Sequence, residues 1–190
     1  MPRNLEIEAK GKLSKRDYQK ILSFYPKAKF IYQTNFYIDN SKFELCKKMV
    51  GLRIRKEKDL VELTLKENCE DGRLEINQKI SPNEFDNFLC NNVFPKGEVM
   101  AYLQENYPEI AGNFTIFGIL ENKRFTVEYE GSEIALDMMK YYEHEEYEIE
   151  CESSSSKLAT ETLKKYLTQF NIKYQKNSIN KLERVLKLIH

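Results

Sequence analysis

Hydrophobic and polar residues alternate with a period of two over most of the chain, which is the pattern of half-buried β-strands. The first such segment is 4–12. Its Leu5, Ile7 and Ala9 point to one side, and the charged residues between them point to the other. Eight more segments alternate in the same way: 28–39, 49–57, 60–68, 73–80, 113–120, 123–130, 133–139 and 145–152. The pattern therefore predicts about nine strands.

Turn and cap signals divide these segments. Asp71-Gly72 predicts a hairpin, and Glu121-Asn122 and Gly131-Ser132 predict two more turns. The sequence Ser-Pro-Asn-Glu at 81–84 predicts a helix start, with a serine cap, proline at the first helical position and glutamate completing a capping box. Five helices are expected, near 15–24, from 81 up to Pro95, and at 98–106, 155–170 and 179–189. Residues 40–48 are expected to form a loop.

The order of these elements indicates the fold class. Consecutive hairpins imply an antiparallel sheet, and the helices make the chain an α+β protein. No stretch resembles a linker and no segment repeats, so residues 1–190 are expected to form a single domain. So many strands in one domain favour closure of the sheet into a barrel, because closure leaves no exposed edge.

Composition narrows the function classes. The chain has 190 residues, with 30 basic and 30 acidic side chains, so its formal net charge is zero. This balance excludes a generic basic protein of nucleic-acid or membrane surfaces. A polyanion would have to be bound by positive charge gathered in one place. Hydrophobic residues at 41% and aromatic residues at 12% argue against disorder.

Neither a targeting segment nor a metal motif of cysteine and histidine is expected. The N-terminus has no apolar core of a signal peptide, and no apolar run approaches the roughly 18 residues that span a bilayer. The four cysteines are widely spaced, which predicts reduced thiols in a cytoplasmic protein. They are Cys46, Cys69, Cys90 and Cys151. His144 and His190 are not spaced as a metal pair, and His144 is expected in a turn rather than in catalysis.

Charged residues recur at strict two-residue spacing on the polar side of the strands. The rows are Glu6-Glu8-Lys10, Arg53-Arg55, Glu62-Thr64-Lys66, Arg73-Glu75-Asn77-Lys79 and Glu146-Glu148-Glu150. In one interpretation the apolar side packs on the helices and these rows face water. In the other, the sheet closes with the charges inside, and a barrel of about eight strands then has room for one small ligand.

The second interpretation specifies a ligand. Charges inside a barrel need balancing partners, water or a charged ligand, because an unpaired buried charge is costly. Arginine forks and lysines suit phosphoryl oxygens. Glutamates are hard oxygen ligands for Mg²⁺ or Mn²⁺ rather than for zinc. The rows therefore predict metal-assisted chemistry on a di- or triphosphate.

A series of motifs along nearly the whole chain resembles the CYTH family, also called the triphosphate tunnel metalloenzymes. It begins with Glu6-x-Glu8-x-Lys10 on the first strand and ends with Asn180-Lys181-x-x-Arg184, where the family pattern has serine in place of Asn180. Between them come 33–39 (QTNFYID), 52–55 (LRIR), 63–66 (LTLK), 74–78 (LEINQ), Arg124, Leu136-Asp137 and 147–150 (YEIE). The series is similar to that of small, single-domain bacterial members.

The resemblance implies a closed, antiparallel, eight-stranded β-barrel, the triphosphate tunnel, with helices packed on the outside. It also implies a triphosphate-containing substrate and Mg²⁺ or Mn²⁺ as cofactor. The implied metal ligands are Glu6, Glu8, Glu75, Asp137, Glu148 and Glu150. The implied phosphate-binding residues are Lys10, Arg53, Arg55, Lys66, Arg124, Lys181 and Arg184.

Several roles remain open within this resemblance. Lys66, with Tyr37 nearby, is a candidate proton acceptor in catalysis, and simple phosphate binding by Lys66 is the alternative. Glu146 is either a third acid of the cluster or a residue at the strand entry. Glu62 is expected to pair with a base of the lumen, and Arg73 and Lys79 either share the polar face or face solvent.

The reaction is expected to be hydrolysis of the phosphoanhydride bond of inorganic triphosphate or of a small organic triphosphate. A class IV-type adenylate cyclase and a non-catalytic module that binds polyphosphate or nucleotide are the alternatives. A 5′-triphosphatase acting on long RNA is disfavoured by the lack of basic excess. Loops 40–48 and 91–113 are expected to select the leaving group. The oligomeric state is not predicted.

Overall fold

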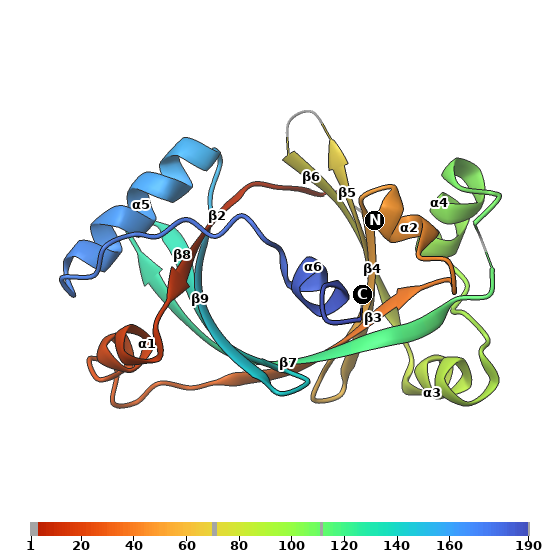
Figure 1. Cartoon of the computed structure of the whole chain (residues 1–190), viewed down its shortest axis with the longest axis horizontal. Coiled ribbons are helices and arrows are strands. Elements are labelled where there is room, and N and C mark those ends of the chain that lie inside the picture. The colour runs from red at the N-terminus through yellow and green to blue at the C-terminus, as the bar shows by residue number, and fades with distance from the viewer. Residues whose placement is uncertain (1–3, 70–71, 111, 190) are drawn as a thin grey trace. The chain divides into compact units, whose positions relative to one another are not determined.

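A computed structural model describes residues 4–69, 72–110 and 112–189 (Figure 1). Asp71 of the expected hairpin turn and the terminal His190 lie outside these residues. The described residues form an α+β fold, in which every strand pair of known register is antiparallel. No helix in this part of the chain is long and apolar enough to cross a membrane.

The described part of the chain contains nine strands and six helices. The strands are β1 (Asn4–Glu6), β2 (Glu8–Leu13), β3 (Ile31–Asp39), β4 (Val50–Glu57), β5 (Leu60–Cys69), β6 (Gly72–Ile80), β7 (Thr115–Tyr129), β8 (Ser132–Tyr141) and β9 (His144–Glu152). The helices are α1 (Lys15–Leu22), α2 (Glu44–Lys47), α3 (Pro82–Asn91), α4 (Glu98–Asn106), α5 (Ser156–Thr168) and α6 (Lys181–Leu186).

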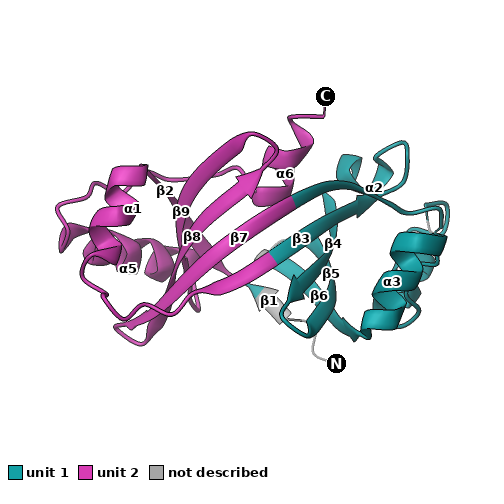
Figure 2. Cartoon of the chain, turned by 90° about the horizontal axis from the view of Figure 1, so that it is seen from below, with its two compact units in different colours: residues 1–6, 34–119 teal, residues 7–33, 120–190 magenta. Residues whose placement is uncertain are grey.

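The strands hydrogen-bond in the order β1-β6-β5-β4-β3-β7-β8-β9-β2. Two compact units share the chain (Figure 2). Unit 1 comprises residues 1–6 and 34–119, and unit 2 comprises residues 7–33 and 120–190. Each unit therefore contains two separate segments of the sequence, and β3 and β7 each contribute to both units. The expectation of one domain over 1–190 stays a prediction, as does closure of the sheet into a barrel.

In unit 1 the apolar side of β4 and β5 packs against helices α3 and α4. Leu52 and Leu65 are fully buried in this core, together with Val99 of α4. Phe88 of α3 joins the same cluster. Burying one such side chain stabilises the fold by about 1.5–3 kcal/mol. The predicted alternation is thus confirmed here, because the helices cover the apolar face.

Unit 2 has a core of its own on the apolar side of β8, β9 and β2. Leu136 and Ile149 are fully buried, and Ile21 of α1 and Leu163 of α5 pack into the same cluster. Ser14 and Ser155 cap these two helices by accepting hydrogen bonds from backbone N–H groups. The polar face of each unit is consequently the face away from these helices, α3 and α4 in unit 1 and α1 and α5 in unit 2.

The first predicted strand is divided in two. β1 pairs with β6, and β2 pairs with β9, so the hydrogen-bonding partner changes at Ile7. Alternation continues through this residue, and the periodic pattern therefore gave no sign of the division. β1 and β2, the two ends of the strand order, are adjacent in the chain.

Two other expectations were wrong. The turn at Glu121-Asn122 does not exist, because both residues lie inside the 15-residue strand β7. Asn122 is a buried residue of the polar face, where its side chain donates a hydrogen bond of 2.9 Å to Asp137. The expected loop 40–48 contains helix α2, in which the backbone N–H groups of Leu45 and Cys46 donate hydrogen bonds to the Asp39 carboxylate. Asparagine and short polar stretches are frequent in turns, which explains both errors.

The start of α4 depends on Gly97 and Gln78. Gly97 has φ of 137°, a conformation that favours glycine, and its position as N-cap provides no side-chain hydrogen bond. The Gln78 side chain of β6 caps the helix instead. It donates a hydrogen bond of 2.6 Å to the Lys96 carbonyl and accepts one of 3.1 Å from the Val99 N–H. A Cβ atom at position 97 would lie 2.5 Å from Gln78 Nε2.

We predict that Gly97→Ala lowers the free energy of unfolding by about 1–3 kcal/mol, because it adds backbone strain and displaces Gln78. Gly112→Ala is the matched control, since Gly112 has a similar φ of 131° but nothing within 4 Å of an added Cβ. Chemical denaturation of the two variants measures the difference. Equal losses would show that the Gln78 contact contributes nothing.

Candidate functional site

Strand register gathers acidic and basic side chains on the polar face of unit 2. Glu148 of β9 lies opposite Asp137 of β8, and Glu150 lies opposite Lys10 of β2. Arg124 of β7 lies opposite Asp137 on its other side. Side chains opposite one another on neighbouring strands have Cβ atoms about 4.5–5.5 Å apart. The alternation that defines each strand thus brings these charges into contact.

Asp137, Glu148 and Glu150 form a compact group of carboxylates. One oxygen from each lies within 4.8 Å of the others. Asp137 and Glu148 have no exposed surface, and Glu150 is 8% exposed. Glu148 and Glu150 of the β9 row are therefore buried, which contradicts the interpretation in which all charged rows face water.

Cations bind each of these carboxylates. Arg124 makes two parallel bonds to Asp137, at 2.7 Å and 2.6 Å, and also bonds to Glu150. Lys181 lies 2.7 Å from Asp137 and 2.6 Å from Glu150. Such fork-to-fork bonds between arginine and a carboxylate are strong and directional. The carboxylates are buried at tolerable cost because their charges are paired.

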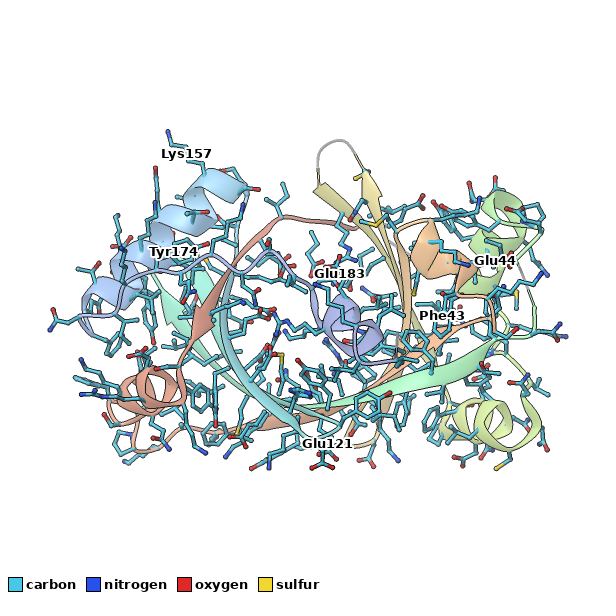
Figure 3. The ribbon with its side chains drawn as sticks, in the orientation of Figure 1. Phe43, Glu44, Glu121, Lys157, Tyr174 and Glu183 are labelled. Atoms are coloured by element: carbon cyan, nitrogen blue, oxygen red, sulfur yellow. The ribbon has the colours of Figure 1, made fainter. Side chains whose placement is uncertain are left out.

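The segment after α5 runs along β2 and carries α6 to the carboxylates. Tyr174 donates a hydrogen bond of 3.0 Å to the carbonyl of Lys10, and the Asn177 N–H donates one of 2.9 Å to the same atom. Asn180 and Glu183 then form a capping box that starts α6. Figure 3 labels Tyr174 on this segment and Glu183 on the helix. This start of the helix holds Lys181 at the carboxylate group.

Arg184 of α6 joins two glutamates of β9. Its guanidinium bonds to Glu148 and lies 3.2 Å from Glu146, and the residue is only 7% exposed. Glu146 also accepts a hydrogen bond of 2.7 Å from the hydroxyl of Tyr141. Glu146 is not a member of the group formed by Asp137, Glu148 and Glu150. Whether it acts as a third acid or as a residue of the strand entry stays open. Its described contacts orient Arg184.

Burial and paired charges shift the pKa values of the group in opposite directions. Burial acts to raise the pKa of Asp137, but the charges of Lys181 and Arg124 outweigh it and lower that pKa. The same competition lowers the pKa of Glu150. At Glu148 burial wins, and its pKa is raised despite Lys181. Glu148 is therefore the carboxylate of the three that holds a proton most readily.

The group has the chemistry of a site for a hard divalent cation. All its donors are carboxylate oxygens, which Mg²⁺ and Mn²⁺ prefer. Glu148 Oε1 is buried and accepts no hydrogen bond from the described residues, although the Lys181 ammonium lies 3.4 Å away. A buried oxygen with spare acceptor capacity is what an additional cation would use. Asp137, Glu148 and Glu150 therefore fit a magnesium or manganese ion.

Lys10 and Glu8 of β2 extend the same face. Lys10 lies 2.7 Å from Glu8 and 3.5 Å from Glu150. Burial acts to lower the pKa of Lys10, but the charges of Glu150, Glu8 and Glu148 raise it overall. Lys10 thus stays charged, as a residue that binds phosphate must.

Unit 1 has a second polar cluster, centred on Lys66 of β5. The Lys66 ammonium lies 2.7 Å from both carboxylate oxygens of Glu6 and 3.3 Å from Glu75. Arg55 donates a hydrogen bond of 3.1 Å to Asn35. Burial and, next, the charge of Arg53 lower the pKa of Lys66. Glu6 and Glu75, expected as metal ligands, are thus bound to a lysine here.

The expected pairing of Lys66 with Tyr37 is indirect. Tyr37 of β3 lies opposite Arg53 of β4, and Arg53 lies opposite Thr64 of β5. Lys66 lies on β5, two residues beyond Thr64, so strand β4 separates it from Tyr37 of β3. Tyr37 is 3% exposed and its ring stacks with Phe117 at 6.3 Å between centroids. The proposed catalytic role of this pair stays a prediction.

The two clusters divide the residues expected in the site. Unit 2 brings together Glu8, Lys10, Arg124, Asp137, Glu148, Glu150, Lys181 and Arg184. Unit 1 holds Glu6, Tyr37, Arg53, Arg55, Lys66 and Glu75. Glu62 of β5, which was expected to pair with a base, lies opposite Arg55 of β4 and Lys79 of β6.

Sequence reasoning missed two asparagines of unit 2. Asn122 bonds to Asp137, and Asn177 donates a hydrogen bond to Glu148. Both are about 95% buried or more. Asn122 stands two residues before Arg124, so the polar-face spacing could have identified it. Asn177 lies outside any periodic element, and only its backbone pairing with β2 places it here.

We predict that Asp137→Asn lowers the free energy of unfolding at pH 7 by roughly 3 kcal/mol or more, because it removes one of the carboxylate charges that pair with the buried Arg124 and Lys181. The pKa of Asp137 is lowered in the folded state, so its stabilisation is complete above the ordinary aspartate value of about 3.9 and is lost below it. The difference from wild type should therefore be constant from pH 7 to pH 5 and shrink below about pH 4.

Denaturation curves at each pH measure this difference. Glu145→Gln, an acid-to-amide change on the same strand at an exposed pair with Lys15, should leave the free energy of unfolding nearly unchanged. A gap that persists undiminished at low pH would contradict the assignment of the stabilisation to the Asp137 charge.

Comparison with known proteins places the chain in a family. YjbK of Bacillus subtilis, named as a candidate triphosphatase, is 33% identical over 186 residues, which is 97% of this chain and 95% of that protein. A crystal structure of a candidate adenylate cyclase from Bacillus halodurans is 33% identical, with a TM-score of 0.87, and covers 97% of this chain and 98% of that one.

A third relative supports the fold alone. A Hippeastrum protein, described as a candidate adenylyl cyclase with a dominant triphosphatase activity, has a TM-score of 0.83 at 22% identity and covers 96% of each chain.

The family model for the CYTH domain matches residues 4–186, which include both polar clusters. The chain therefore belongs to the CYTH family.

Proposed function

We propose that this protein hydrolyses a phosphoanhydride bond of inorganic triphosphate or of a small organic triphosphate, with a divalent metal ion as cofactor. The observation that carries the proposal is the group of three buried carboxylates, Asp137, Glu148 and Glu150, interleaved with arginines and lysines. Acids that suit a divalent cation and bases that suit phosphate stand in one network. YjbK, the Bacillus subtilis relative named as a candidate triphosphatase, supports the same reaction.

In this proposal Asp137, Glu148 and Glu150 hold the ion, with Glu8 near them through Lys10. When bound, Mg²⁺ or Mn²⁺ would neutralise phosphate charge and lower the pKa of a water molecule. The carboxylates keep their negative charge at neutral pH where paired cations lower their pKa. The raised pKa of Glu148 makes ion binding stronger at higher pH, because that carboxyl must lose its proton.

The basic residues would bind and orient the phosphates. Arg124, Lys181 and Arg184 are now bonded to carboxylates, and a bound cation competes with them for the same oxygens. Their freed N–H groups would then serve phosphoryl oxygens, which match the guanidinium fork. In a phosphoryl transfer such positioning and charge neutralisation provide most of the catalysis.

For Lys66 the contacts favour phosphate binding over proton transfer. Its ammonium bonds to Glu6 and Glu75, which stabilise the charged form. Burial and the charge of Arg53 nevertheless lower its pKa, which is the shift that a proton acceptor requires. Lys66 is therefore proposed as a phosphate ligand, and proton acceptance with Tyr37 is the alternative.

A cyclase is the second candidate, because the Bacillus halodurans relative is named for that activity. Cyclisation would use the same grip on the triphosphate but would also require recognition of adenine and activation of a ribose hydroxyl. The two reactions give different products, so one assay separates them.

We predict that, with Mg²⁺ or Mn²⁺, the protein releases phosphate from inorganic triphosphate or from an organic triphosphate, and forms no cyclic AMP from ATP. The test compares inorganic triphosphate, ATP, thiamine triphosphate and pyrophosphate, and EDTA should abolish turnover. Cyclic AMP as the main product of ATP would establish the second candidate, and binding without any turnover would leave a non-catalytic module.

We also predict that Glu148→Gln lowers kcat on the order of 100-fold or more, because a lost ligand charge removes several kcal/mol of transition-state stabilisation. Calorimetric titration with Mn²⁺ should show weaker binding by the same variant. Glu145→Gln, exposed on the same strand, is the control and should keep wild-type values. Wild-type Mn²⁺ affinity in Glu148→Gln would refute its assignment as a ligand.

A further inference from the structure

Arg73 is a half-buried residue at the start of β6 with a hydrogen-bond donor that has no partner in the described residues. Its Nε–H group is buried and donates no hydrogen bond to any acceptor in the described residues. A buried donor of this kind costs free energy unless a ligand or another group uses it. The motif-based assignment did not include Arg73, and it left open whether the residue faces solvent.

Strand register places Arg73 on the polar face of unit 1. Leu74 and Ile76, its neighbours in the alternation, pack with the core cluster under the helices. Arg73 lies opposite Asn68 of β5, and Asn68 is two residues from Lys66 on the same face. Arg73 is therefore a diagonal neighbour of Lys66, at a distance of about 7–8 Å between backbones.

Arg53 occupies the corresponding position on the other side of Lys66. It lies opposite Thr64, two residues from Lys66 in the other direction, on β4. Its Nε atom is likewise buried without an acceptor among the described residues. Two arginines thus flank one lysine, one from each neighbouring strand, and both have an unused buried donor.

Nearby carboxylates do not satisfy these arginines. Glu6 lies directly opposite Arg73 on β1, yet both of its oxygens bind Lys66 at 2.7 Å. Glu75 lies on β6, two residues after Arg73, and its carboxylate is 3.3 Å from the Lys66 ammonium. Both acids thus bind the central lysine, and the Nε atoms of the two flanking arginines have no acceptor in the described residues.

We propose that Arg73 binds a phosphoryl oxygen of the substrate, completing a row of three cations, Arg53, Lys66 and Arg73, across β4, β5 and β6. The assignment rests on the proposed function, because it takes the substrate to be a linear chain of phosphoryl groups. A chain of three groups has enough anionic oxygens to contact cations at this spacing. A shorter anion, such as pyrophosphate, would leave one end of the row unused, so Arg73 would favour triphosphate over pyrophosphate.

The test is the kinetics of inorganic triphosphate hydrolysis by wild type, Arg73→Ala, Arg73→Gln and Arg73→Lys. Loss of one charge-assisted hydrogen bond should raise KM roughly tenfold or more and change kcat little. Arg73→Lys should restore part of the affinity, because it keeps the charge. Arg16→Ala removes an exposed arginine of α1 and is the matched control for a loss of net charge.

Two further measurements keep the outcomes separate. Thermal unfolding shows whether each variant folds, and Arg73→Gln preserves most of the side-chain packing if Arg73→Ala does not fold. Calorimetric titration with inorganic triphosphate in EDTA measures binding without turnover. An affinity in the Arg73 variants equal to wild type would overturn the role of Arg73. A wild type that binds triphosphate more tightly than the variants but never hydrolyses it would overturn the proposed function alone.

Discussion

The pairing of buried carboxylates with buried cations is the constraint on which unit 2 depends. Asp137 and Glu148 have no contact with solvent, and an isolated charge in that position would be strongly unfavourable. Arg124, Lys181 and Arg184 make the burial tolerable. The same pairing keeps the site ready for a ligand, because each cation that a metal ion displaces becomes available to an anion.

This constraint also explains why the C-terminal segment matters. Lys181 and Arg184 reach the carboxylates only because residues 174–177 pair with β2 and the capping box at Asn180 starts α6 there. The paired segment and the short helix therefore belong to the site as much as the strands do. In unit 1 the balance is different, since Glu6 and Glu75 bind Lys66 and leave the flanking arginines with unused donors.

The rest of unit 2 serves to hold these groups in register. The core formed by α1, α5 and the apolar side of the strands fixes which residues face the site. Because side chains alternate strictly along a strand, a shift of one residue in β9 would move Glu148 and Glu150 into that core. The site is thus protected by the cost of burying two carboxylates among apolar side chains.

By itself, the sequence determined which residues share a polar face. Period-two alternation predicted Lys10, Arg53, Lys66 and Glu148 as members of charged rows, and the cap signal at Ser81 predicted a helix start, because these are local properties. The tertiary structure decided which strands pair and which side chains bind one another. The change of partner at Ile7, the burial of Asn122 and Asn177, and the assignment of Glu6 to Lys66 depend on strand register and on residues far away in the chain, which no local pattern encodes.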